Sequence, residues 1–270
     1  MAYHIGTMIV SAHLIPHSPL LLPTIGKERT EALSVTRAAI EQCVAEIRAA
    51  KPDTIIIVSN HGTVYKDAFS TNIHDPYTAH FEEFGDFATR FTAKPDLMTA
   101  DRLKRHWRIA GVPHTQSSDD SLDYGSAVTL SFLTPLLLNT RIIPLSPSHL
   151  DGKAHFEAGL HASEVLLASN KRFSIICSGD LSQRLSTISP AGFSKNGEIF
   201  DTKIKELLTA HNILGLLKLD QEMVTDAGEC AYRPLLLVLG MIEAFRYQTE
   251  IKSYEAPFGV GELVANFKLG

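Results

Sequence analysis

Short, almost wholly apolar runs alternate along this chain with longer segments of helical periodicity, and that alternation limits the folds open to it. Strands that are apolar on both faces are typical of parallel sheets covered by helices on both sides. The sequence therefore predicts an α/β fold with a mixed, mostly parallel sheet and helices on both faces. The expected strands are 8–13, 54–59, 141–145, 172–177, 252–253 and 260–267. The expected helices are 28–50, 97–110, 126–138, 153–169 and most of 197–246, with breaks near 211 and 226–229, and 60–96 is expected to be irregular.

No linker, low-complexity tract or internal repeat divides the 270 residues. We therefore expect a single domain over residues 8–270. Residues 1–7 are expected to be an extension or a tag, because Met8 resembles a natural start.

Composition excludes several classes of protein. Apolar residues make up 44% of the chain and charged residues 20%, which is ordinary globular usage. The net charge is −5 and lysines and arginines do not cluster, so general nucleic-acid binding is not expected. Three cysteines without metal or disulfide spacing favour a reducing compartment. The uncharged first 26 residues lack the basic start of a signal peptide and contain prolines, so we expect a cytoplasmic protein without a membrane partner.

The loops that follow the expected strands contain the side chains suited to chemistry. Ligands of open α/β sheets bind beyond the carboxyl ends of the strands. His17 follows the first strand and His61 follows the second, and each is flanked by Gly or Pro. Two imidazoles and one carboxylate form a facial set that leaves open positions on non-haem Fe(II). Glu255 is the candidate carboxylate and Glu262 competes with it, while His13 competes with His17.

Five segments stand out in the expected loops and strand ends: 15–23, 59–62, 123–125, 178–185 and 253–259. Taken in order, they resemble the class III extradiol ring-cleavage dioxygenases. This family is typified by the β subunit of protocatechuate 4,5-dioxygenase, and the Memo proteins are relatives. The resemblance implies Fe(II) held by His17, His61 and Glu255, with Zn or Mn as alternatives. It also implies opening of a catechol-like or aminophenol-like ring with O₂.

The chain departs from this family at two positions where an acid/base histidine is common. Tyr124 and Gln183 stand there instead. An amide cannot take up a proton near neutral pH, and tyrosine has a reference pKa of about 10. Another histidine, His13 or His149, could take over the role. Further candidates for supporting the metal or the substrate are Asp123, Asp180 and Arg184, although the two aspartates would also suit helix caps and the arginine a surface position.

These departures leave two other functions open. One is a non-catalytic metal-binding homologue or partner subunit. The other is a hydrolase that uses Zn or Mn at the same ligands. The expected partners of the leading hypothesis are a small aromatic substrate and O₂, and relatives suggest a homodimer or a paired subunit.

Overall fold

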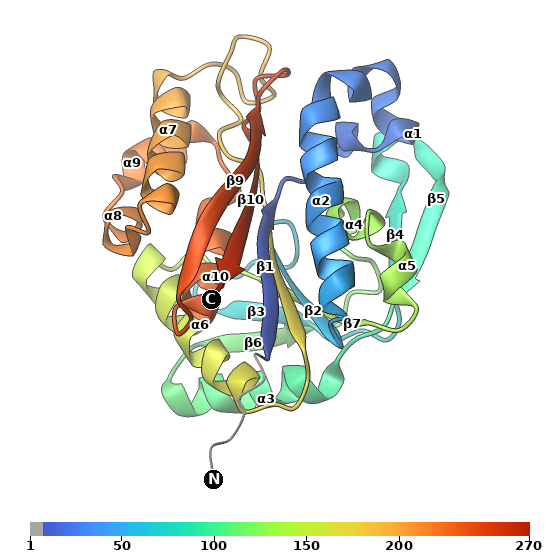
Figure 1. Cartoon of the computed structure of the whole chain (residues 1–270), viewed down its shortest axis with the longest axis vertical. Helices are drawn as coiled ribbons and strands as arrows, with labels where there is room; N and C mark the ends of the chain where they lie inside the picture. Colours follow the sequence, from blue (N-terminus) through green and yellow to red (C-terminus); the bar gives the residue numbers. More distant parts are fainter. Residues whose placement is uncertain (1–7) are drawn as a thin grey trace.

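The computed structural model describes residues 8–270, and the expected extension at 1–7 lies outside them. An eight-stranded sheet crosses the middle of the molecule in the order β6-β3-β7-β2-β8-β1-β10-β9, and helices cover both of its faces (Figure 1). This confirms the predicted α/β fold. The strands are β1 (Ile9–Ile15), β2 (Thr54–Ser59), β3 (Phe69–Asn72), β6 (His114–Ser117), β7 (Arg141–Ser146), β8 (Phe173–Ser178), β9 (Tyr247–Glu255) and β10 (Glu262–Leu269).

The four central strands, β7, β2, β8 and β1, run parallel to one another. Every residue of β2 and β8 is buried, because each strand has one row of side chains under the helices of either face. In β2, Ile55 and Ile57 belong to one core cluster, whereas Ile56 and Val58 belong to the other. The continuous apolar runs seen in the sequence thus reflect burial on both sides.

Different helices and strands cover the two faces of the sheet (Figure 1). One face is covered mainly by α2 and by a small hairpin of β4 and β5, the other by the packed pair α6 and α10 together with α3. None of the helices in the described part of the chain is long and apolar enough to cross a membrane. The bounds on the first face are α1 (Pro23–Gly26), α2 (Ser34–Ala50), β4 (Tyr77–Phe81), β5 (Asp86–Ala93), α4 (Tyr124–Ser131) and α5 (Thr134–Leu137). The remaining helices are α3 (Leu97–Ala110), α6 (Gly152–Leu167), α7 (Lys195–Thr209), α8 (Ile213–Leu217), α9 (Gln221–Ala227) and α10 (Tyr232–Ile242).

Two expectations about local structure were wrong. Residues 60–96 are not irregular, because they contain β3, β4 and β5. Only alternate residues of β4 are fully buried and half of β5 is exposed, so neither strand has the apolar run used to find the others. The single helix expected at 126–138 is two, α4 and α5, because Pro135 lacks an N–H and starts the second one.

Glycines allow α6 and α10 to pack with their backbones nearly touching. A Cβ atom at Gly240 would lie 2.2 Å from the carbonyl oxygen of Phe156, and one at Gly159 would lie 2.2 Å from that of Leu237. The contact matters for function because α10 starts two residues after Cys230, which belongs to the site described below.

We predict that Gly240→Ala lowers the free energy of unfolding by about 1–3 kcal/mol, the usual cost of overpacking. The added methyl group meets backbone atoms, which cannot rotate away. Urea unfolding would measure the change. Ala38→Val on the exposed side of α2 is the control, with an expected cost near the difference in helix propensity, about 0.6 kcal/mol. Equal losses in the two variants would contradict close backbone packing.

A buried histidine at the start of α6 is held in its neutral form. The Nδ1 atom of His155 lies 2.7 Å from the carbonyl oxygen of Asp151, to which it donates, and Nε2 accepts from the backbone N–H of Ser148 at 3.2 Å. Burial lowers the pKa of His155 to about 4. Protonation at Nε2 would remove the acceptor that Ser148 uses.

Because the folded pKa lies below the unfolded value of 6.5, His155 stabilises the fold fully above pH 6.5, and this contribution falls as the pH drops toward 4. His155→Gln keeps an acceptor for Ser148 but does not titrate. We therefore predict that the variant loses less stability than the wild type between pH 7 and pH 4.5, as measured by urea unfolding. Parallel losses in the two proteins would show that His155 does not titrate in this range.

Candidate metal centre

Three neighbouring strands place the candidate residues at one edge of the sheet. Ile15 of β1 and Ser59 of β2 both pair with Ser178 of β8, so the carboxyl ends of the three parallel strands lie in one row. His17, His61 and Asp180 each come two residues after this row. The shared register therefore brings together three side chains that are up to 163 positions apart in the sequence.

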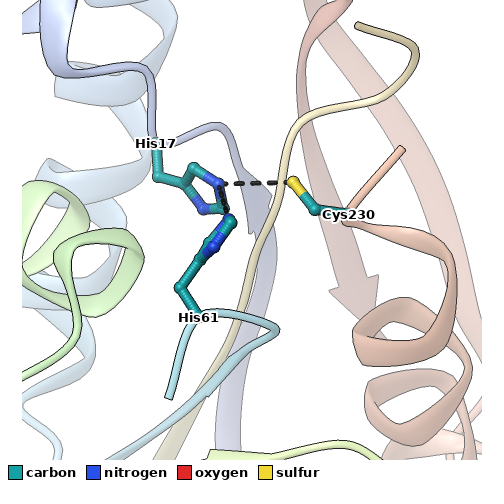
Figure 2. A group of neighbouring side chains, drawn as sticks. All are labelled: His17, His61 and Cys230. Atoms are coloured by element: carbon teal, nitrogen blue, oxygen red, sulfur yellow. Dashed lines mark hydrogen bonds between the residues drawn. The ribbon is translucent and has the colours of Figure 1, made fainter. Parts of the chain in front are cut away.

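The two predicted imidazoles meet at this edge (Figure 2). The Nε2 atoms of His17 and His61 are 3.0 Å apart, and the rings are nearly perpendicular at 77°. His17 is fully buried, whereas His61 is partly exposed. The pair is thus open to solvent only on the side of His61.

The third member of the group is Cys230, in the segment between α9 and α10 (Figure 2). Its Sγ atom lies 3.3 Å from Nε2 of His17, and the ligand atoms of all three residues lie within 4.8 Å of one another. Sequence reasoning missed Cys230 because a lone cysteine has no ligand spacing. Its position beside an expected break in the long helical stretch 197–246 was the only available signal.

Hydrogen bonds determine which nitrogen of His17 faces the group. The hydroxyl of Ser178 donates to the carbonyl oxygen of Gly125 at 2.8 Å, so its single proton is already used. Its oxygen, 3.0 Å from Nδ1 of His17, must then accept the N–H of that nitrogen. In the neutral imidazole, Nε2 is then the nitrogen with the lone pair, and it faces His61 and Cys230.

Burial keeps the other two groups neutral. Desolvation, and then the neighbouring His17, lower the pKa of His61 to about 4. Burial raises the pKa of the Cys230 thiol, and the carboxylates of Asp180 and Glu229 raise it further. Beside His17, the centre therefore offers a neutral imidazole and a thiol that ionises only if a positive charge comes close.

Asp180 ties two of these segments together. Its carboxylate accepts from the backbone N–H of His17 at 2.9 Å, and its carbonyl accepts from the N–H of Cys230 at 3.2 Å. Its other carboxylate oxygen lies 3.7 Å from Nε2 of His17. The predicted supporting role of Asp180 has this geometric basis.

The start of α4 supports the pair from the opposite side. Asp123 caps the helix by accepting from Ser126 N–H and also accepts from the Ser59 hydroxyl, which in turn contacts the backbone of His61. A Cβ atom at Gly125 would lie 3.0 Å from Nδ1 of His17 and 3.1 Å from Cδ2 of His61. Only glycine lets the helix approach both rings this closely.

The two predicted catalytic residues also border the centre. The hydroxyl of Tyr124 is 2.9 Å from Nε2 of His61, and its ring packs against Phe84. Burial raises the pKa of Tyr124, so the phenol stays protonated. The amide nitrogen of Gln183 is 4.0 Å from the sulfur of Cys230. Neither residue is charged at neutral pH.

The structure does not bring the remaining candidates into the group. Glu255 accepts from the backbone N–H of Thr36 at 2.8 Å, and Glu262, its pairing partner across β9 and β10, is buried with no hydrogen bond to Oε2 from the described residues. Arg184 pairs with Asp226. His13 is buried against Glu46 of α2, and His149 is exposed after β7. The metal-ligand role of Glu255 stays a prediction from resemblance.

Comparison with known proteins agrees with this fold. The chain is 28% identical over 258 residues to Protein CA_C1420 of Clostridium acetobutylicum, a match that covers 92% of the chain but about half, 55%, of that relative. The fold is similar to the crystal structure of the uncharacterized protein JW3007 from Escherichia coli K12, with a TM-score of 0.66 and 19% identity over 95% of this chain and 99% of that one.

A family model for the catalytic LigB subunit of aromatic ring-opening dioxygenase matches residues 11–265, which include every member of the centre. The chain therefore belongs to the LigB family of aromatic ring-opening dioxygenase subunits, as its ordered motifs indicated.

Proposed function

We propose that this protein holds a metal ion between His17, His61 and Cys230. The observation that carries the proposal is the convergence of two imidazoles and a thiol on one point beyond the ends of β1 and β2. Two close Nε2 atoms would repel each other if neither held a proton, and a shared cation removes that repulsion. Neutral imidazole nitrogen and thiolate sulfur are common ligands of transition metals in proteins.

In this proposal Cys230 takes the place that the family resemblance assigns to Glu255. Thiolate favours Fe(II) or Zn over Mn, because sulfur is a softer ligand than carboxylate oxygen. Three protein ligands leave positions for substrate, as catalytic sites require. Asp180 accepts hydrogen bonds from the backbone N–H groups of His17 and Cys230, and these bonds would hold the two residues at a constant separation whichever metal binds.

We propose opening of a diol-bearing aromatic ring with O₂ as the reaction, on the strength of family membership. Fe(II) would supply the electron transfer between ring and oxygen that such a reaction needs. Tyr124 would hold a proton at its hydroxyl beside His61 and donate it during the reaction. Gln183 would contribute only hydrogen bonds, since its amide does not ionise.

We predict that His61→Ala and Cys230→Ser each lower the affinity for Fe(II) and Zn by tenfold or more, whereas Glu255→Gln keeps the wild-type affinity. Equilibrium dialysis with metal analysis would measure binding, and circular dichroism would check the fold. Loss of metal in Glu255→Gln, with retention in Cys230→Ser, would show that the carboxylate is the ligand and would refute our assignment.

We predict that Fe(II)-loaded protein takes up O₂ with catechols or aminophenols and forms a ring-fission chromophore. The Tyr124→Phe variant should react about 10²-fold or more slowly while it keeps its iron. Gln183→His, which restores a group able to take up a proton, should raise the rate. Bound iron without uptake in wild type and Gln183→His would favour the non-catalytic homologue. Turnover with zinc in the absence of O₂ would favour the hydrolase.

A further inference from the structure

A cavity of about 290 Å³ opens beside His61. It is bounded by the loop after β2, the ends of β3 and β6, and two residues of β7. Its volume is at the lower end of the range of small-molecule sites, roughly 300–1,000 Å³. His61 belongs both to the cavity wall and to the metal centre, so the cavity adjoins the centre.

The cavity wall carries negative charge that no lysine or arginine of the wall balances. Asp119 and Asp123 line it, and none of the other lining residues is a lysine or an arginine. The rest of the wall offers mainly uncharged hydrogen-bonding groups, such as those of Thr63, Asn72 and Ser146.

Each carboxylate keeps one oxygen free for a ligand. Asp123 uses Oδ1 to accept from both Ser59 and Ser126, and its Oδ2 accepts no hydrogen bond from the described part of the chain. Asp119 accepts from the Thr63 hydroxyl through Oδ2 at 2.8 Å, and its backbone is held by the side chain of Asn72. Both carboxylates are therefore fixed in place with an unused acceptor.

We propose that this cavity is the substrate subsite of the metal centre and that it selects small hydroxylated molecules with a positively charged amine, while it rejects carboxylates. The inference rests on the proposed function for the reacting end of the molecule. An anionic group in the cavity would face two carboxylates and no lysine or arginine of the wall, whereas an ammonium group would find two acceptors.

Three catechols that differ chiefly in the charge of one substituent test the proposal: dopamine, 4-methylcatechol and 3,4-dihydroxyphenylacetate. Isothermal titration of Zn-loaded protein measures binding without turnover. We expect the affinity to fall in that order, with dopamine bound about tenfold or more tightly than the anion. Equal or tighter binding of the anion, or binding of none of the three, would overturn the inference.

Asp119→Lys and Asp120→Lys form a matched pair, because both positions are exposed and adjacent but only Asp119 lines the cavity. Asp119→Lys should weaken dopamine binding about tenfold and strengthen binding of the anion, whereas Asp120→Lys should change either affinity much less. Equal effects in the two variants would indicate general surface attraction and contradict a built subsite. Metal content, measured in every sample, shows separately whether the proposed metal centre itself has failed.

Discussion

The site depends on one feature of the sheet, the parallel register of β1, β8 and β2. Pairing of Ile15 and Ser59 with the same residue, Ser178, aligns the ends of three strands. A slip of one residue in any strand would turn its side chains to the opposite face and shift its loop along the edge. His17, His61 and Asp180 lie together because the central sheet, buried on both faces, permits no such slip.

Polar contacts then fix the orientations of the side chains that the strand register brings together. Asp180 holds the backbones of His17 and Cys230, and Ser178 sets the tautomer of His17. Gly125 allows α4 to close over both imidazoles. These groups are themselves buried and satisfied, so the imidazoles have little freedom to rotate away from the point where they converge. A centre built in this way is arranged before any ligand arrives.

The neutrality of the inner centre contrasts with the negative cavity beside it. Burial keeps His61, Tyr124 and Cys230 uncharged, so the local field at the centre comes from neighbouring carboxylates, which include Asp180 and Glu229 near Cys230 and Asp123 near His61. That field favours a cation at both places, a metal ion at one and an ammonium group at the other. In the proposed reaction, the proton chemistry rests on the phenol of Tyr124 beside His61.

The sequence by itself determined the fold class, most central strands and the proximity of His17 and His61, because buried parallel strands give continuous apolar runs and their carboxyl ends share one edge. It did not reveal β4 and β5, whose half-exposed strands lack such runs. Only the tertiary structure places Cys230 beside His17, which is 213 positions away in the sequence, and shows that Glu255 accepts from the backbone of α2. Long-range packing of α10 against α6 decides where Cys230 lies, and no local pattern encodes a contact at that separation.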